Sequence, residues 1–115
     1  MSDQHDDRAT LRDFREAVNM TPAALEGWLE TDASRSVGAK HGAGAESVGH
    51  ASGRRIVDLL RTKQADYGPG DYAHMRKVVG YVHRHLAQRP HRSAAELEHT
   101  RWRHSLMNWG HDPLR

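Results

Sequence analysis

The longest periodic stretch of apolar residues runs from Gly70 to Pro90. Its apolar positions recur every three or four residues, which places them on one face of an α-helix. These positions are Tyr72, Met75, Val79, Val82 and Leu86. Asp71 can cap the helix after Pro69-Gly70, and Pro90 limits its end. The opposite faces carry Arg, Lys and His, so the pattern predicts a long central helix with one apolar side and one cationic side.

Four other segments have helical periodicity, and they cover residues 8–19, 22–30, 52–64 and 94–108. Thr21-Pro22, Ser52 and the Ser93-to-Glu96 capping box are signals for helix starts. Gly110 ends the last segment. The predicted buried positions are Leu11, Phe14, Val18, Leu25, Trp28, Leu29, Ile56, Leu59, Leu60, Leu97, Trp102, Leu106 and Trp109. No stretch alternates as a strand would, so we predict an all-α bundle of about five helices.

Glycine is concentrated between residues 31 and 53, where the apolar periodicity is lost. This composition predicts a Gly-rich loop that is either functional or flexible. Residues 1–7 are polar and acidic, which predicts a disordered N-terminal tail. The length of 115 residues fits one domain, which we place at residues 8–115.

The composition excludes several kinds of chemistry. The chain has no cysteine, so it has no disulfide, thiolate metal site or cysteine nucleophile. No histidine pair has the spacing of a helical metal site. His83 and His85, for example, are two residues apart and point away from each other on a helix. We therefore expect no metal and no cofactor. The N-terminus lacks the pattern of a signal peptide, and no apolar run could span a bilayer, which predicts a cytoplasmic protein without a membrane partner.

Charge is distributed unevenly along the chain. Residues 1–30 hold seven acidic and three basic side chains, whereas residues 31–115 hold eight acidic and fourteen basic ones. Such a basic region attracts polyanions, and phosphates bound by Arg and Lys release counterions. The predicted nucleic-acid-binding residues are Arg54, Arg55, Arg61, Lys63, Arg76, Lys77, Arg84 and Arg89. The plain alternative is an ordinary solvated surface, and a helix-turn-helix across the 66–70 turn stays open.

The end of the Gly-rich segment leads into a helix that carries Arg54 and Arg55. Backbone N–H groups at such a junction point toward an anion, and arginine binds phosphate oxygens in pairs. The predicted phosphate-loop residues are Ser47, Gly49, Ser52 and Gly53. An NTPase loop is excluded, since His50 and Ala51 stand where lysine and a hydroxyl residue are required.

Four segments carry a resemblance to a known family: FREAVNMTPAALEGWL, ESVGHASGRRIVDLL, DYAHMRKVVGYVHRHLAQRP and TRWRHSLMNWGHDPLR. They resemble small bacterial and fungal proteins known as domain of unknown function thirty-one-forty, over most of the chain from Phe14. Members are commonly labelled DNA-binding, and some fungal relatives join the domain to a Tudor-like barrel. The resemblance implies a self-contained helical module and supplies no catalytic or binding residues to carry over.

The sequence thus favours a non-enzymatic protein that binds nucleic acid, DNA in the first place, through phosphate contacts. The first alternative is a protein-interaction module or homodimer that uses acidic residues 3–30 and apolar helix faces. The second is an enzyme acting on a phosphorylated small molecule. Such an enzyme would require His50, Asn108, His111 and Asp112 to converge near the Gly-rich loop.

Overall fold

The computed structural model describes residues 6–38 and 46–115, and every regular element within these ranges is helical. The elements are α1 (Asp7–Ala17), α2 (Pro22–Leu29), α3 (Asp32–Ser36), α4 (Val48–Leu60), the 3-10 turn η1 (Gln64–Asp66), α5 (Pro69–Leu86), α6 (Ala94–Leu97) and α7 (Arg101–Asn108). The prediction of an all-helical bundle around a long helix is confirmed. The helices outnumber the predicted five because α3 lies in the expected loop and the last predicted helix is divided.

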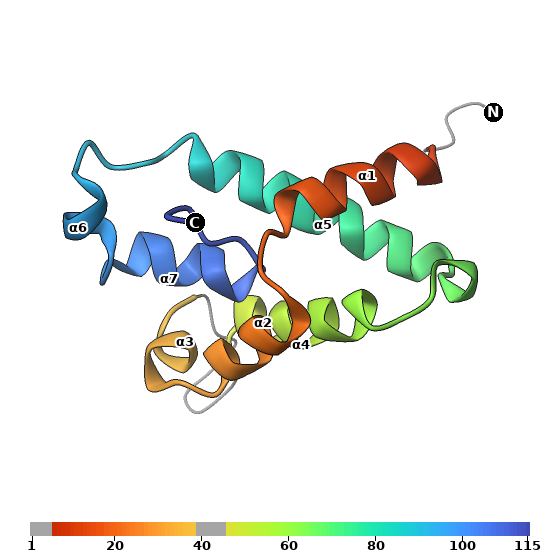
Figure 1. Cartoon of the computed structure of the whole chain (residues 1–115), viewed down its shortest axis with the longest axis horizontal. Coiled ribbons are helices and arrows are strands. Elements are labelled where there is room, and N and C mark those ends of the chain that lie inside the picture. Colours follow the sequence, from red (N-terminus) through yellow and green to blue (C-terminus); the bar gives the residue numbers. More distant parts are fainter. Residues whose placement is uncertain (1–5, 39–45) are drawn as a thin grey trace.

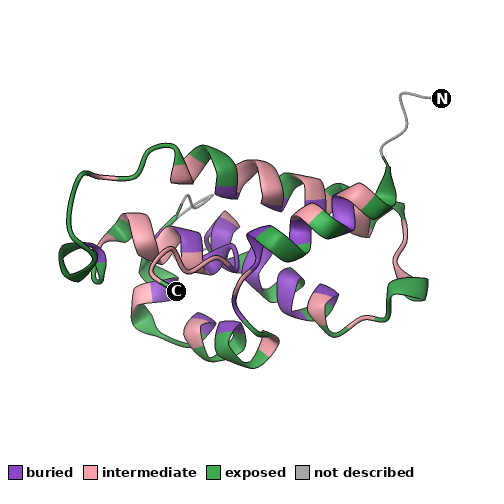
Figure 2. Ribbon diagram, turned by 45° about the horizontal axis from the view of Figure 1, so that its top comes forward, coloured by how far each residue is buried: buried purple, intermediate pink, exposed green. Residues whose placement is uncertain are grey.

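The helices pack as two pairs joined by α7. In Figure 1, α1 lies across α5 and α2 lies beside α4, while α7 contacts α2, α3, α4 and α5. Buried residues face the interior where these elements meet (Figure 2). The core includes Leu11, Phe14, Val18, Leu25, Leu29, Ile56, Leu59, Met75, Val82, Leu106 and Trp109. In the described ranges, no helix is both long and apolar enough to cross a bilayer.

The core also differs from the predicted list. Val57 and Val78 were not predicted to be buried, yet they are 5% and 0% exposed. The stripe of α5 is wider than its apolar periodicity indicates, because the helix packs against α1 on one side and α7 on another. Other predicted core side chains are half-buried against the cluster: Trp28, Leu60, Tyr72, Val79, Leu86 and Trp102.

Helix α4 begins earlier than predicted. Ser47 is its N-cap, and the Ser47 hydroxyl accepts a hydrogen bond from the His50 amide at 3.0 Å. The prediction that Ser52 caps this helix is wrong, since Ser52 lies inside α4 and is buried. The predicted Gly-rich loop at 31–53 is therefore wrong at both ends, where α3 and the first turns of α4 form. Its residues 39–45 lie outside the described ranges.

The other helix boundaries follow capping signals. Gly68, not Asp71, is the N-cap of α5, and the Asp71 carboxylate accepts the Gly68 amide at 2.9 Å from the first turn. The Ser93 capping box starts α6 as predicted. Thr100 then caps α7 through the Arg103 amide at 3.2 Å, which divides the predicted 94–108 helix. Gly110 follows α7 with a φ of 84°, a left-handed conformation that suits glycine.

The N-terminal tail prediction is corrected at its last residues. The Asp6 carboxylate caps α1, accepting the Arg8 amide at 2.9 Å, and Asp7 is the first residue of that helix. Acidic side chains at this end are favourable because helix N-termini carry partial positive charge. The rest of the predicted tail, residues 1–5, lies outside the described ranges.

Candidate functional site

Aromatic rings from α5 and from α7 with its C-cap form a nearly parallel stack, which we call the aromatic ladder. Its rings are, in spatial order, His74, Trp109, Tyr81, His85 and Trp102. Successive planes differ by 11° to 15°, with centroids 4.3 to 6.4 Å apart. The guanidinium of Arg89 lies 5.5 Å from the Trp102 centroid at one end. His74, Tyr81 and His85 are seven and four residues apart on α5, so their rings lie on one face of that helix. Trp102 and Trp109 are seven residues apart, and their contacts with these rings join α7 to α5.

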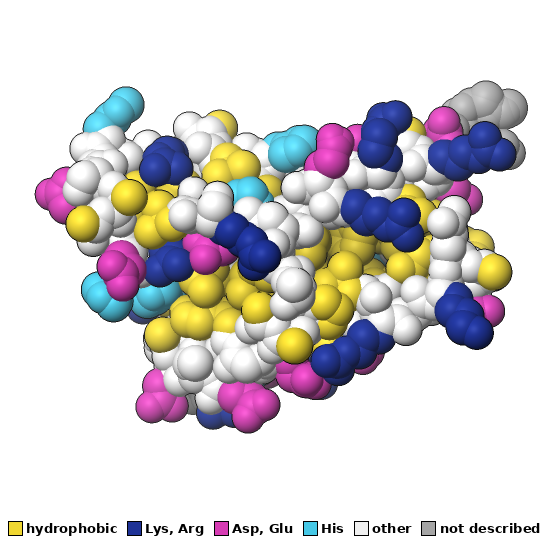
Figure 3. Space-filling view, in the orientation of Figure 1, with side chains coloured by type: hydrophobic (Ala, Val, Ile, Leu, Met, Phe, Trp, Pro, Cys, Tyr) yellow, Lys and Arg dark blue, Asp and Glu magenta, His cyan; other side chains and the backbone are white. Residues whose placement is uncertain are grey.

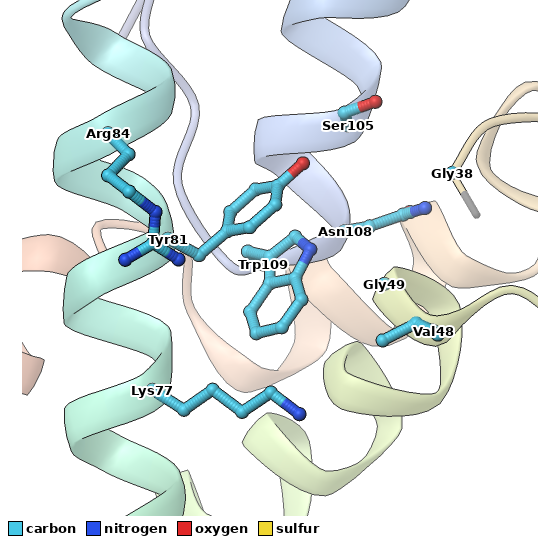
Figure 4. A pocket seen from close by; sticks show the side chains of 9 residues that line it. All are labelled: Gly38, Val48, Gly49, Lys77, Tyr81, Arg84, Ser105, Asn108 and Trp109. Carbon is cyan, nitrogen blue, oxygen red and sulfur yellow. The ribbon is translucent and has the colours of Figure 1, made fainter.

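A pocket of about 310 Å³ opens beside the middle of the ladder. Its lining comes from α4, α5, α7 with its C-cap, and the residue that follows the C-cap of α3: Gly38, Val48, Gly49, Lys77, Tyr81, Arg84, Ser105, Asn108 and Trp109. Figure 4 shows Lys77 and Tyr81 extending from α5 toward α4 and α7, with the Arg84 guanidinium beside Tyr81. No acidic side chain is among the lining residues. The pocket therefore combines an aromatic wall with two cations.

No hydrogen bond joins the indole N–H of Trp109 to a described residue, and the residue is only 4% exposed. The fully buried polar side-chain atom that lacks a partner in the described ranges is His85 Nε2, so the Trp109 N–H faces the open space of the pocket. The indole N–H groups of the other two tryptophans have acceptors. Trp28 donates to the side-chain oxygen Oδ1 of Asn108 at 2.8 Å, and Trp102 donates to the backbone carbonyl oxygen of His85 at 2.9 Å. A Cβ built on Gly49 would lie 3.0 Å from Trp109 Nε1. Glycine at this position thus keeps the space beside the indole N–H open.

The first turn of α4 forms one wall of this pocket. Ser47 caps only the His50 amide, so the amides of Val48 and Gly49 have no acceptor within the described ranges. These free N–H groups give the pocket the partial positive charge of a helix N-terminus. Together with Trp109 and Ser105, they make the lining rich in hydrogen-bond donors.

Burial shifts the pKa values of the titratable side chains in the ladder. It lowers the pKa of His74 to about 4, and the charges of Arg55 and Lys77 act in the same direction. Burial also lowers the pKa of His85 and raises the pKa of the Tyr81 phenol, which the Ser105 hydroxyl partly offsets. At neutral pH both histidines are uncharged and Tyr81 keeps its proton. The positive charge of the pocket therefore comes from Lys77 and Arg84.

A closed polar cluster, which we call the Asn108 hub, surrounds the side-chain amide of Asn108, a residue that also lines the pocket. The Asn108 side chain is fully buried. Its carbonyl oxygen accepts from Trp28 and from the Ser34 hydroxyl, at 2.8 and 2.5 Å, and its amide donates to the Ser34 carbonyl at 3.0 Å. Asn108 thereby joins α2 and α3 to α7. These contacts assign it a structural role.

A search against family models places residues 13–107 within Protein of unknown function (DUF3140). The chain belongs to this family. No curated protein and no solved structure matches the chain. The predicted resemblance is thus confirmed, and the matched range includes most of the pocket of this DUF3140 protein, apart from Asn108 and Trp109.

The predicted basic residues of the DUF3140 chain do not form one continuous face. Two of them lie on the α2 side of α4: Arg61 contacts Glu26 at 3.1 and 3.2 Å, and Arg54 contacts Glu46 at 2.5 and 2.7 Å. Arg54 holds the pKa of Glu46 at about 2. Arg55 instead reaches α5, where it contacts Asp71 at 3.4 Å. The other five make no ion pair within the described ranges: Lys63, Arg76, Lys77, Arg84 and Arg89.

The predicted phosphate-loop residues belong to the cap and first turns of α4. The Ser47 hydroxyl is used as the cap, and Ser52 lies 3.0 Å from His74 Nε2. Gly53 is buried at a position where a Cβ atom would lie 2.6 Å from the backbone oxygen of Asn108. These residues form the cap and first turns of a helix and not a loop, and they pack against α5 and α7. Phosphate binding by them stays a prediction. Only Gly49 of the four lines the pocket.

The residues required by the enzyme alternative do not converge. His50 is buried with Nε2 2.7 Å from the Leu29 carbonyl oxygen and Nδ1 against Glu46. His111 contacts the Ala17 carbonyl at 2.7 Å, and Asp112 forms a two-bond ion pair with Arg103. His50 thus joins α4 to the end of α2, and His111 and Asp112 join the C-terminal segment to the end of α1 and to α7. Within the described residues, no cluster of three His, Asp or Glu is arranged to hold a metal.

A second basic surface lies on α1 and was not predicted. Arg8, Arg12 and Arg15 are exposed and border a hollow of about 380 Å³ that is also lined by Leu11, Glu16 and Gln64. Figure 3 shows several Lys and Arg side chains over α1, with Asp and Glu side chains among them. The net negative charge of residues 1–30 concealed this stripe. Its signal was the spacing of four and three residues, which places the arginines on one helical face.

Proposed function

We propose that this protein is non-enzymatic and binds nucleic acid, DNA in the first place, through phosphate contacts from basic side chains on and near α5. The observation that carries the proposal is the pair Lys77 and Arg84. Both are exposed, lie seven residues apart on α5, and make no ion pair with a described residue. Arg89 extends the same set of cations beyond the end of α5. Such cations bind phosphates without reading base sequence.

The remaining predicted residues contribute unequally under this proposal. Arg76 and Lys63 have no carboxylate partner among the described residues and add to the positive field. Arg54 and Arg61 each hold a carboxylate through two hydrogen bonds, so part of their charge is already neutralised. We therefore assign Lys77, Arg84 and Arg89 the largest share of the binding energy.

Fluorescence anisotropy with labelled duplex DNA, single-stranded DNA and RNA tests the proposal. For about four phosphate contacts, we expect affinity to fall roughly a hundredfold between about 50 and 200 mM salt. The double variant Lys77→Gln/Arg84→Gln should weaken binding to unrelated sequences alike, by about tenfold or more at low salt. Arg61→Gln is the matched control, since it removes a similar exposed charge from the α2 side of α4.

Two results would overturn the proposal. The first is the absence of binding to all three nucleic acids at low salt. The second is equal weakening by Arg61→Gln and by the double variant, which would remove α5 from the interface. If the chain ignores nucleic acid and elutes as a dimer in size-exclusion chromatography, the protein-interaction alternative replaces the proposal.

A further inference from the structure

We propose that the pocket between α4, α5 and α7 binds the phosphate group of a small molecule. The argument begins with its polar atoms. Trp109 Nε1 and the α4 amides are donors only, and Lys77 and Arg84 are cations. The hydroxyls of Tyr81 and Ser105 can also donate. With no carboxylate among the lining residues that the structure describes, these groups favour an oxyanion over a cation or a neutral ligand.

The indole N–H of Trp109 separates this pocket from an ordinary helix N-terminus. The Trp109 residue is only 4% exposed, but its Nε1 is not among the fully buried polar atoms of the described residues and borders the open space of the pocket. The indole N–H groups of the other two tryptophans, Trp28 and Trp102, both donate to acceptors of the protein. Trp109 has no such partner among the described residues, and its ring is fixed between Tyr81 and His74. An anion in the pocket would supply the acceptor that this fixed donor lacks.

The charge and the arrangement favour phosphate over carboxylate. Two cations face the pocket from α5, and a phosphate monoester carries up to two negative charges, whereas a carboxylate carries one. Donors approach from three helices: Gly49 on α4, Lys77 and Arg84 on α5, and Ser105 on α7. A tetrahedral group presents oxygens in several directions and can use donors arranged in this way. The volume of about 310 Å³ is at the small end for ligand sites, so it suits a small metabolite.

This inference goes beyond the proposed nucleic-acid binding. Phosphates within a duplex are diesters with one charge each, and surface cations contact them from outside. The pocket lies beside a half-buried ring and would hold a terminal phosphate group. Lys77 and Arg84 serve both proposals, but Ser105, Trp109 and Gly49 belong to the pocket alone. Variants at these positions therefore test the pocket separately.

The experiment follows the three indole N–H signals in a ¹⁵N–¹H correlation spectrum while inorganic phosphate is added. The Trp109 signal is assigned by its loss in Trp109→Phe. We expect this signal to shift downfield and to saturate at millimolar phosphate, while those of Trp28 and Trp102 stay in place. Sodium chloride and sodium acetate at equal ionic strength should leave it unmoved. Adenosine monophosphate should shift it at lower concentration than phosphate, and adenosine should not.

Variants assign the effect to the pocket. Ser105→Ala and Arg84→Gln should each raise the phosphate concentration at half-saturation about fivefold to tenfold, the loss expected for one polar contact to a charged group. Arg92→Gln is the matched control, because Arg92 is an exposed arginine outside the pocket lining. Gly49→Ala should abolish the shift, since its Cβ would lie 3.0 Å from Trp109 Nε1. Circular dichroism of each variant confirms that it remains folded.

The inference is overturned if phosphate leaves the Trp109 signal in place, if chloride or acetate moves it equally, or if Arg92→Gln weakens the effect as much as Arg84→Gln. A phosphate shift without duplex binding would remove only the proposed nucleic-acid function. Duplex binding without a phosphate shift would remove only the pocket. A shift produced by acetate alone would assign the pocket to carboxylates and overturn the choice of phosphate.

Discussion

Asn108 and Trp109 are adjacent in the chain, yet their polar groups lie in different environments. Asn108 is buried with partners for its carbonyl oxygen and its amide, from Trp28 and Ser34. Trp109 is almost as deeply buried, but its N–H has no acceptor among the described residues and borders a pocket. The comparison separates two uses of buried polarity. Closed hydrogen-bond networks fix the fold, whereas converging donors without acceptors leave room for a ligand.

The same contrast extends along α4, which packs against both regions. Gly53 lies against the backbone oxygen of Asn108 and the side chain of Leu29. A Cβ atom on Gly53 would lie 2.6 Å from the first and 2.7 Å from the second. Gly49, one turn earlier, lies against Trp109, where a Cβ would be 3.0 Å from Nε1. The two glycines let α4 approach α7 closely. Gly53 makes room for the backbone of Asn108 and for Leu29, and Gly49 keeps the space beside the Trp109 indole open.

The largest expected effect comes from breaking the hub. Asn108→Ala leaves the Trp28 N–H, the Ser34 hydroxyl and the Ser34 carbonyl without partners. We expect the free energy of unfolding to fall by about 3 to 4 kcal/mol, since each stranded buried group costs about 1 to 3 kcal/mol. Urea denaturation followed by circular dichroism measures this change.

The matched control for this variant is Ser105→Ala, on the pocket side of the same helix. It should change the free energy of unfolding by no more than about 0.5 kcal/mol, because no closed network depends on it. Equal destabilisation by the two variants would contradict the distinction between hub and pocket.

The second prediction compares glycines. Gly53→Ala should lower the free energy of unfolding by about 2 kcal/mol, because its Cβ would overlap a backbone oxygen that cannot move aside. Gly49→Ala should cost less, since its neighbour is the edge of one side chain. Gly27→Ala, with open space around it in α2, should raise the free energy of unfolding by about 0.5 to 1 kcal/mol. Thermal and urea unfolding give this order, and a stabilising Gly53→Ala would refute the close approach of α4 to α7.

The boundaries of the fold followed from the sequence where a side chain signals them directly. Thr21-Pro22, the Ser93 capping box and Gly110 were read correctly, because caps are local interactions. The start of α4 was missed because Gly49 and Gly53 resembled loop residues. Their spacing of four places both on one helical face, but only the tertiary contact with α7 explains why glycine is required there.

The candidate site could be predicted from the sequence less completely than the fold. The spacing of Trp102 and Trp109 predicted a shared face, but the register between α5 and α7 decides that Tyr81 and His85 lie between them. Ion pairing also depends on tertiary structure. Nothing local indicates that Arg61 meets Glu26, thirty-five residues away, while Arg84 meets no described carboxylate. The sequence shows the excess of basic residues, but it does not show which of them are free of ion pairs with described residues.

The third prediction uses pH to separate the two regions, with the smallest expected effect. The hub's hydrogen bonds involve no titratable side chain, whereas the ladder contains His74, whose pKa burial lowers from 6.5 to about 4. The unfolded chain therefore binds a proton at His74 below about pH 6.5, and the folded protein does not do so until about pH 4. The stability from this residue is present above pH 6.5 and declines as the pH falls through that window.

Because His74 is only half-buried, we expect a loss of about 1 kcal/mol in the free energy of unfolding between about pH 7 and pH 5. Urea denaturation at both pH values measures it. His74→Gln should flatten the dependence, because the amide does not titrate. Asn108→Ser, which alters the hub without adding a titratable group, should lower stability at both pH values and keep the slope. If His74→Gln retained the full slope, the acid sensitivity would not arise at this end of the ladder. The uncharged state of His74 beside Trp109 would then lose its support.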